Sequence, residues 1–325
     1  MRFIVYGAGA VGGVVGGRLG EHGHDVVLIA RGAHADAMRR SGLTIESPDV
    51  TTTVDVPVAT HPSEVELGPD DVVLLAMKSQ DTHDALLALR AAAPPSLPVV
   101  CLQNGVENER AALRVFERVY GINVMCPAGH FEPGVVQAHS TPLSGILDLG
   151  RYPSGADETA EAVAAALSAS TFVSEVRDDI MRWKYAKLLM NLGNAVQALC
   201  GRAAARGPLG ELVRAEGIAC LEAAGIEFVS AEEDRARRGD LLRIGPIGDR
   251  ERPGGSSWQS LERRTGAIES DYLNGEVVLL GRRHDVPTPA NALLQQLAAE
   301  AAAARAAPGS LAPEVFLERL RARSA

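Results

Sequence analysis

Several features that would indicate particular classes of protein are scarce in this sequence. Aromatic residues make up only 4%, so a core has to come mostly from Ala, Val and Leu. No two of the four cysteines have C-x-x-C spacing, so we expect reduced thiols and no metal site. No apolar run approaches the roughly 20 residues that span a bilayer, and the N-terminus lacks the regions of a secretion signal. We therefore expect a soluble cytoplasmic protein with no membrane partner.

Basic charge is also in short supply. Lys and Arg total 32 against 41 Asp and Glu, which gives a net charge of −9. Because neutralising phosphates requires a basic surface, we expect no nucleic-acid partner, although a local basic pocket for an anion is compatible with this balance. Hydrophobic residues at 46% and charged residues at 22% are typical of a globular protein, and 325 residues favour two domains.

The first part of the chain alternates between buried strands and helices. The expected strands are 2–6, 25–30, 71–77 and 98–102, and the expected helices are 11–22, 33–42 and 82–92. Short links between such elements predict a parallel sheet with helices on both faces, which is the Rossmann-type doubly wound α/β class. Further along, 121–149 has the composition of strands and turns, 157–168 of a helix and 174–177 of a last strand.

Beyond residue 178 the pattern is almost entirely helical. The expected helices are 180–200, 208–224, 230–242, 257–282, 289–306 and 313–323. The Gly- and Pro-rich stretch 245–255 predicts an exposed loop. We expect a dinucleotide-binding domain over 1–178 and an all-α substrate and catalytic domain over 179–325, with catalysis in the cleft between them.

A glycine-rich motif follows the first strand and opens the first helix, in the run Gly7-Ala8-Gly9-Ala10-Val11-Gly12. In this context the spacing indicates a dinucleotide-binding turn. The first glycine permits the tight turn, the second lets pyrophosphate approach the backbone, and the third lets helix and strand pack closely. Backbone N–H groups at the helix start attract the phosphates.

The end of the second strand indicates which dinucleotide binds. NAD enzymes usually carry Asp or Glu there for the ribose hydroxyls, whereas this chain has Arg31. A guanidinium attracts a 2′-phosphate and can bind two of its oxygens, so we predict NADPH/NADP as the cofactor. The alternative is a solvated surface arginine.

Two polar residues follow later strands of the predicted sheet. Lys78 comes after 71–77 and Asn104 after 98–102, at the edge where ligands bind in open α/β sheets. Lys78 could reach cofactor phosphate or substrate, and Asn104 could orient the nicotinamide ribose or the substrate. Ordinary surface loops would explain either residue alone.

A polar stripe marks the first predicted helix of the second domain. Lys187, Asn191 and Asn194 are spaced i, i+4, i+7 and so share one face. Carbonyl reduction needs a proton donor and groups that hold the substrate, and this face could supply both. Lys184 falls near the same face and competes with Lys187 for the role of proton donor. A solvated helix face is the alternative.

A third cluster lies further on, at 256–262 and 269–275. Ser257 could hydrogen-bond a substrate carboxylate, and Glu269 could accept a bond from a substrate hydroxyl or tune the lysine. Glu262, Glu269 and Glu276 recur every seven residues, which a solvated stripe along one helix would explain equally well.

In the order of these motifs the chain resembles the ketopantoate (2-dehydropantoate) reductase family. The residues that carry the resemblance are 7–12, Arg31, Lys78, 103–105, Glu132-Pro133-Gly134, Lys187, Asn191, Ser256-Ser257 and 269–275. The resemblance implies a Rossmann domain followed by a helical domain, and reduction of a 2-oxo acid by NADPH, with ketopantoate as the first candidate. It also implies a small-molecule partner, with a homodimer as a candidate assembly.

The resemblance assigns roles residue by residue. Arg31 matches the arginine at the NADPH 2′-phosphate, and Lys78 and Asn104 match residues that line the cofactor and substrate cleft. Lys187 matches the general acid, which favours it over Lys184. By the same resemblance, the substrate is held by Asn191, its carboxylate is bound by Ser257, and Glu269 hydrogen-bonds it and assists the lysine.

The chain also departs from the family pattern near the substrate. The family's second asparagine falls at Ala195, with Asn194 one position early. Three other interpretations stay open: a β-hydroxyacid dehydrogenase, a 2-hydroxyacid dehydrogenase using His130 or His139, and a noncatalytic NADP-binding sensor.

Overall fold

A computed structural model describes residues 1–324, which form two compact units. The first unit contains Met1–Lys184 and Ser230–Arg252, and the second contains Tyr185–Val229 and the chain from Pro253 on. The chain thus first leaves the Rossmann unit after Lys184 rather than at residue 178, and a later segment returns to it.

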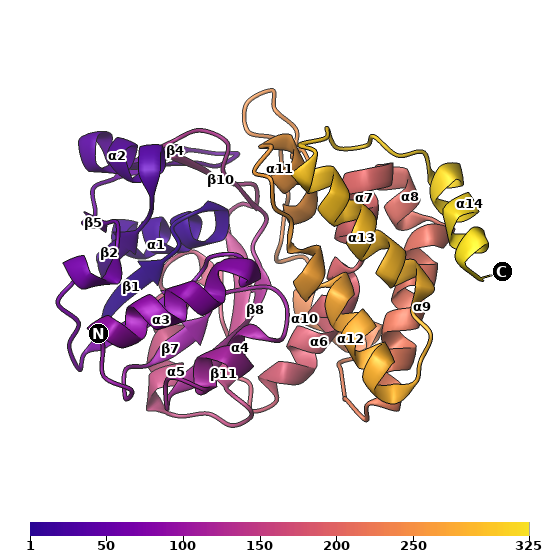
Figure 1. The fold of residues 1–325 in the computed structure, drawn as a ribbon. Helices are drawn as coiled ribbons and strands as arrows, with labels where there is room; N and C mark the ends of the chain where they lie inside the picture. Colours follow the sequence, from indigo (N-terminus) through magenta and orange to yellow (C-terminus); the bar gives the residue numbers. More distant parts are fainter. Residues whose placement is uncertain (325) are drawn as a thin grey trace. The chain divides into compact units, whose positions relative to one another are not determined.

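The first unit is built on an eight-stranded sheet in the order β12-β11-β8-β7-β6-β1-β2-β5. Its strands are β1 (Arg2–Tyr6), β2 (Asp25–Ile29), β5 (Val58–Ala59), β6 (Asp71–Leu75), β7 (Val99–Cys101), β8 (Val119–Met125), β11 (Gly145–Arg151) and β12 (Phe172–Val173). All pairs are parallel except β8 with β11. The predicted α/β class with a parallel sheet is confirmed (Figure 1).

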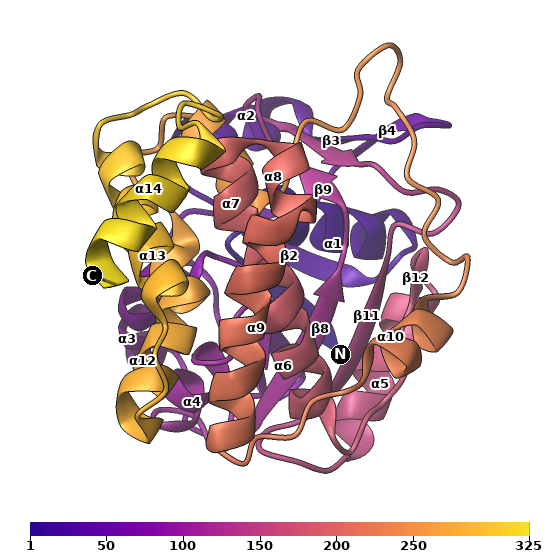
Figure 2. The same cartoon turned by 90° about the vertical axis from the view of Figure 1, so that its right-hand side faces the viewer.

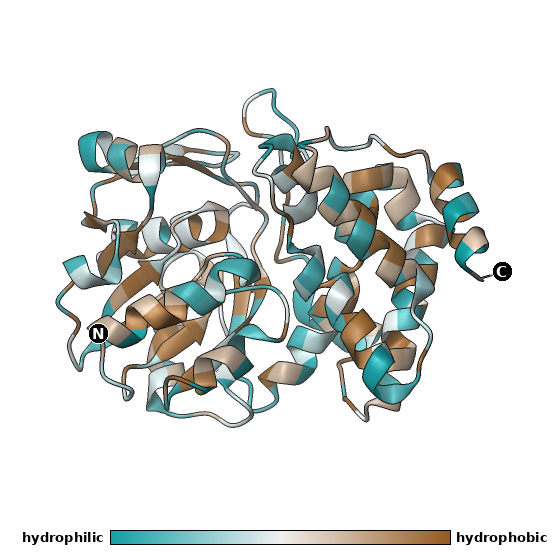
Figure 3. Ribbon diagram, in the orientation of Figure 1, coloured by the Kyte–Doolittle hydropathy of each residue, from teal (hydrophilic) through white to brown (hydrophobic). Residues whose placement is uncertain are grey.

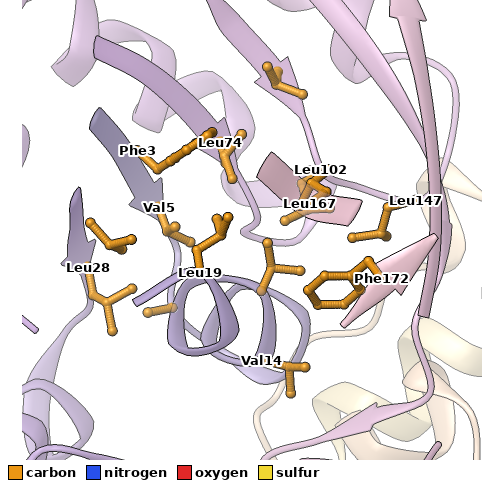
Figure 4. Packing of buried hydrophobic residues seen from close by; sticks show 14 of the residues in the cluster. Phe3, Val5, Val14, Leu19, Leu28, Leu74, Leu102, Leu147, Leu167 and Phe172 are labelled. Carbon is orange, nitrogen blue, oxygen red and sulfur yellow. The ribbon is translucent and has the colours of Figure 1, made fainter. Parts of the chain in front are cut away.

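Helices cover both faces of this sheet because its strands are apolar on both sides. Along β1, Phe3 and Val5 belong to one buried cluster, with α1 (Ala10–Glu21) and α5 (Glu158–Ser168). Ile4 belongs to the other, with α3 (Thr82–Ala92) and α4 (Asn108–Leu113). Figure 4 shows the first cluster around Leu19 of α1, and Figure 3 shows the strands of the sheet in hydrophobic colours.

A second, four-stranded sheet lies in the order β4-β3-β10-β9 and packs on α1. Its strands are β3 (Leu43–Glu46), β4 (Thr51–Val54), β9 (Ala128–Gly129) and β10 (Val135–Ala138). The unit also contains α2 (Gly32–Ser41), η1 (Pro62–Glu64) and η2 (Ser79–Asp81). The sequence indicated strands within 121–149, but not that β10 pairs with β3 in this separate sheet.

The returning segment carries α10 (Ala231–Arg238), whose start is closed by a capping box between Ser230 and Glu233. Arg237 donates two hydrogen bonds, of 2.7 and 2.6 Å, to the fully buried carboxylate of Asp148. The loop that follows is bound as well, since the Gly245 N–H donates to the carbonyl of His139 at 2.9 Å. These bonds hold the segment on the Rossmann unit.

The second unit is helical, as predicted, and Figure 2 shows its helices. They are the end of α6 (Ile180–Asn191), α7 (Gly193–Cys200), α8 (Arg202–Arg206), α9 (Pro208–Ala223), α11 (Ser256–Glu262), η3 (Glu269–Tyr272), α12 (Asn274–His284), α13 (Pro289–Ala303) and α14 (Pro313–Ser324). Two long helices expected from the sequence are interrupted. The stretch 180–200 breaks between α6 and α7, and 257–282 divides into α11, η3 and α12.

The break after α6 is stabilised by a side chain from α12. Asn274 donates a hydrogen bond of 3.2 Å to the carbonyl of Leu192, and a second one of 2.9 Å to Oδ1 of Asn291. Because Asn274 is fully buried, the bond to Leu192 gives a carbonyl freed by the break a partner. The asparagine in the run 269–275 therefore has a structural role.

Candidate cofactor and catalytic site

The glycine-rich loop between β1 and α1 has the tight geometry that its first and third glycines predict. Gly7 has φ +101°, and a Cβ on it would lie 2.6 Å from the Met77 nitrogen. A Cβ on Gly12 would lie 2.4 Å from the Gly7 oxygen. The chain's own packing therefore requires glycine at both positions.

Gly9 differs from these two glycines. A Cβ on Gly9 would meet no atom within 4 Å, so nothing in the described chain accounts for a glycine there. Gly9 caps α1, and the first helical bond runs from the Gly13 N–H to the Gly9 carbonyl at 2.7 Å. The earlier N–H groups of the helix precede that bond and present the positive end of the helix dipole. This open, amide-lined turn fits the pyrophosphate of a dinucleotide.

Arg31 lies at the end of β2 as the N-cap of α2, and its side chain is 80% exposed. No acid follows β2 in the chain, but Asp81 of η2 reaches the same place. The Arg31 guanidinium lies 3.9 Å from the Asp81 carboxylate, which is 49% exposed. The guanidinium is therefore accessible to an anion, and a carboxylate stands beside it.

A buried hydrogen-bond network joins the segments that carry Lys78 and Asn104. The side chain of Asn108 donates to the Asn104 carbonyl and to Ser79 Oγ, both at 3.0 Å. Gln103 donates to the Met77 carbonyl at 2.9 Å. Residues 77–79 after β6 and 103–104 after β7 are thus fixed to each other, as the shared sheet edge predicts.

Lys184 on α6 is buried, and it forms one ion pair and two hydrogen bonds. Its ammonium lies 2.8 Å from Oε1 of Glu109 and donates to the carbonyls of Gln103 at 2.7 Å and Ile122 at 3.1 Å. The carboxylate and the two carbonyl oxygens compensate for the burial of the ammonium charge. Burial raises the pKa of the Glu109 carboxyl, while Lys184 opposes that change. Lys184 therefore holds α6 to the Rossmann sheet, and its side chain is buried away from solvent.

This ion pair was not predicted, although one signal in the sequence points to it. The chain has only three lysines among its 32 basic residues, namely Lys78, Lys184 and Lys187. A chain that otherwise uses arginine keeps lysine where a compact ammonium is needed. The composition alone could therefore have singled out all three positions.

Lys187 and Asn191 lie i, i+4 on α6, within the second unit. Lys187 is half-buried and Asn191 is buried. The predicted single stripe with Asn194 is wrong in one respect, because the break after α6 places Asn194 on α7. A Cβ on Gly255 would lie 3.0 Å from Oδ1 of Asn194, so this amide faces the start of α11.

Ser257 lies in the first turn of α11, two residues after Gly255. It is 2% exposed, and its Oγ atom has no hydrogen-bond partner within residues 1–324. A buried hydroxyl without a partner is costly, which fits a group that bonds a ligand or an ordered water.

Glu269 is the first residue of η3 and is 5% exposed. Glu262 ends α11 and Glu276 lies in α12, so the three glutamates stand on three separate elements. The alternative of one solvated helix stripe is therefore wrong, since it required a continuous helix and an exposed Glu269.

The two histidines considered for a 2-hydroxyacid dehydrogenase are His130 and His139. The ring of His130 lies with its centroid 4.1 Å from that of His34, and its Nδ1 is 3.0 Å from the Val135 carbonyl. His139 is buried, and burial lowers its pKa.

All four cysteines are unpaired. Residues 1–324 contain no group of three metal-binding side chains and no helix with the length and apolarity to cross a membrane.

Together, the sheet, the glycine-rich turn and the helical second unit define a class, the NAD(P)-dependent oxidoreductases with a Rossmann domain. The family model described as "Ketopantoate reductase PanE/ApbA" matches residues 3–154, and its C-terminal companion matches residues 179–302. The chain belongs to the ketopantoate reductase family.

Individual proteins and structures agree with this membership. The chain is 27% identical over 308 residues to a 2-dehydropantoate 2-reductase of Pyrococcus abyssi, covering 90% of this chain and 95% of that protein. It is similar to the crystal structure of a PanE/ApbA family ketopantoate reductase from Ralstonia eutropha JMP134, with a TM-score of 0.78, 31% identity and coverage of 94% and 99%. The ternary structure of D-mandelate dehydrogenase with NADH and anilino(oxo)acetate shares the fold, with a TM-score of 0.79 at 24% identity and coverage of 94% and 99%.

Proposed function

We propose that this protein reduces a 2-oxo acid to a 2-hydroxy acid with NADPH, and that 2-dehydropantoate is the substrate, giving pantoate. The observation that carries the proposal is that the two lysines of α6 have different surroundings. Lys184 is buried, paired with the Glu109 carboxylate and hydrogen-bonded to the carbonyls of Gln103 and Ile122, whereas Lys187 is half-buried and lies one turn further on. Lys187 is therefore the lysine of α6 that can act on a substrate.

Arg31 supports the preference for NADPH over NADH. Its guanidinium is 80% exposed at the end of β2, where the 2′ position of the adenosine ribose is recognised in this fold. A 2′-phosphate carries more negative charge than the Asp81 carboxylate and offers oxygens for a bidentate contact. The phosphate would therefore displace Asp81 from Arg31.

Different residues have different roles in the proposed reaction. When bound, NADPH supplies the hydride that reduces C2 of the oxo acid. The Lys187 ammonium donates the proton that converts the carbonyl oxygen into the hydroxyl, and its charge stabilises the negative charge that develops there. Lys78, Asn104 and Asn191 bind and orient the oxo acid.

The remaining groups of the second unit fix the substrate further. Ser257 Oγ, which is buried and has no partner in the described chain, donates to the substrate carboxylate. Asn194, which faces the start of α11, binds beside it. Glu269 accepts a hydrogen bond from the substrate hydroxyl and holds the lysine in place.

A spectrophotometric assay tests the function. Purified enzyme is supplied with NADPH and a panel of 2-oxo acids: 2-dehydropantoate, other branched-chain 2-oxo acids and an aromatic 2-oxo acid. We expect oxidation of NADPH with the highest kcat/KM for 2-dehydropantoate. Preference for the aromatic acid would overturn the substrate assignment, and binding of NADPH without turnover on any acid would indicate a sensor.

A further inference from the structure

One histidine joins three parts of the Rossmann unit around the proposed cofactor site. His34 lies in the first turn of α2, close to Arg31. Its Nε2 atom is 2.7 Å from the Ala8 carbonyl, in the middle of the glycine-rich loop. Its Nδ1 atom is 2.8 Å from the backbone nitrogen of Gly134, in the turn before β10.

These two partners fix where the ring carries its proton. The backbone N–H of Gly134 can only donate, so Nδ1 must accept. In a neutral ring Nε2 then carries the proton and donates to the Ala8 carbonyl. Burial, and secondly the nearby His130, lower the pKa of His34 to about 4, which keeps the ring neutral at neutral pH. Both ring nitrogens are therefore committed in one defined tautomer.

The bond to Ala8 restrains the peptide next to the open glycine. The Ala8 N–H already donates to the Ile29 carbonyl at 3.1 Å, and the Gly9 N–H to the Gly7 carbonyl at 2.7 Å. With the Ala8 carbonyl also held by His34, the peptide between Ala8 and Gly9 has a hydrogen bond at each end. That peptide leads directly into the first amides of α1, which face the phosphates in this fold.

The bond to Gly134 is less important for the loop, because Gly134 is restrained in other ways. It has φ +82°, and a Cβ on it would lie 3.0 Å from the Ala37 side chain. Its carbonyl accepts from the Thr44 N–H at 2.9 Å. The turn at Gly134 would therefore stay in place without the histidine.

We propose that His34 is a positioning residue for cofactor binding: its Nε2–H, donated to the Ala8 carbonyl, holds the glycine-rich loop in the shape that receives the dinucleotide phosphates. The proposal rests on the proposed function only in that a dinucleotide binds this loop. It predicts an effect on cofactor affinity and none on the chemical step, since His34 touches neither reacting group.

Two substitutions separate the two bonds. In His34→Gln the side-chain amide nitrogen occupies the place of Nε2 and can still donate to Ala8. In His34→Asn the side-chain oxygen occupies the place of Nδ1 and can still accept from Gly134, but nothing reaches Ala8. His284→Gln and His284→Asn serve as matched controls, because His284 is a half-exposed histidine near the end of α12 in the other unit.

The readouts are the Kd for NADPH from fluorescence titration, the KM for NADPH, and kcat at saturating cofactor. Loss of one buried hydrogen bond predicts that His34→Asn weakens NADPH binding about tenfold while kcat stays near the parent value. His34→Gln should stay within about threefold of the parent, and both control variants should be unchanged.

Several results would overturn the proposal. These are equal losses in the Asn and Gln variants, unchanged affinity in both, weaker binding in Gln than in Asn, or a fall in kcat with KM unchanged. A parent enzyme that fails to bind NADPH would instead refute the proposed function. Should His34→Asn not fold, ¹⁵N NMR of the parent ring decides: the Nε2–H tautomer at pH 7 supports the proposal, and the Nδ1–H tautomer or a charged ring refutes it.

Discussion

The ammonium of Lys184 and the carboxylate of Glu109 lie 2.8 Å apart, and their side chains are 2% and 0% exposed. The pair joins α6 to α4, and the further bonds of Lys184 tie the same helix to the segment after β7 and to the middle of β8. A buried charge that loses its partner is strongly destabilising, since it can be neither solvated nor paired. The pair is therefore a structural bond that holds the helix carrying Lys187.

Breaking this pair should cost stability. We expect Lys184→Met and Glu109→Gln each to lower the free energy of unfolding by about 3 kcal/mol. The double variant Lys184→Met with Glu109→Gln should be less destabilised than the sum of the single variants, because it leaves no unpaired charge. Thermal and urea unfolding measure both effects. Single variants as stable as the parent would contradict the structural role.

Lys187 should show the opposite behaviour. Lys187→Ala removes the proposed proton donor, so we expect kcat to fall by about 10²- to 10⁴-fold. The Kd for NADPH should stay close to the parent value, because the proposed role of this ammonium is at the carbonyl of the oxo acid. Stopped-flow turnover and fluorescence titration test this. Normal turnover in Lys187→Ala would remove the lysine from the mechanism.

The sequence predicts those structural features that depend on residues close to one another along the chain. The turn at Gly7 and Gly12 could be predicted because the strand, the glycines and the helix follow one another directly. The position of Arg31 follows from the same local order. The alternation of strands and helices likewise predicts the parallel sheet, since each element carries its own apolar pattern.

Features that join distant segments could not be predicted in this way. Glu109 lies in the short helix α4, which has no clear periodic pattern, and its partner is far along the chain on α6. Similarly, Asp81 reaches Arg31 only because β6 and β2 both lie beside β1. The break after Leu192 depends on Asn274, whose side chain comes from α12.

The glutamate pattern shows how a correct spacing can mislead. Glu262, Glu269 and Glu276 have helical spacing, yet positive φ values at Arg264 (+51°) and Gly266 (+78°) interrupt the helix between the first two. A residue with positive φ commonly ends a helix. An isolated glycine such as Gly266 does not rule out a helix when only the sequence is known, so the interruption could not be predicted. Resemblance to the family, and not spacing, favours a separate role for Glu269, which stays a prediction.

Arg31 and Asp81 should together set the choice between NADPH and NADH. Arg31→Ala should raise the KM for NADPH about tenfold or more, since it removes a charge-assisted contact to the 2′-phosphate. The KM for NADH should change little, because NADH has no phosphate there. A parent enzyme that prefers NADH would contradict the assignment of Arg31.

Asp81→Asn should act in the other direction. It removes the carboxylate that stands 3.9 Å from the guanidinium, so NADPH should bind about two- to fivefold more tightly. The gain is small because both side chains are largely exposed and the pair is screened by solvent. Raising the salt concentration should reduce the difference between Asp81→Asn and the parent. Equal NADPH affinity in the two proteins at low salt would show that Asp81 does not compete.

Ser257 allows a test in which stability and function move separately. Its Oγ atom is buried and has no partner in the described chain, so Ser257→Ala removes a polar atom without breaking a bond. We expect unchanged or slightly higher thermal stability. If Ser257 binds the substrate carboxylate, the KM for the oxo acid should rise about tenfold, with the KM for NADPH unchanged.

Ser270 provides the matched control for this experiment. It is also buried, on η3, with an Oγ atom that has no partner within residues 1–324. Ser270→Ala should therefore resemble Ser257→Ala in stability and the parent in its KM for the oxo acid. If both variants leave that KM unchanged, the Ser257 hydroxyl binds water rather than substrate. If both raise it equally, the effect comes from packing around α11 and η3 and not from a bond to the carboxylate.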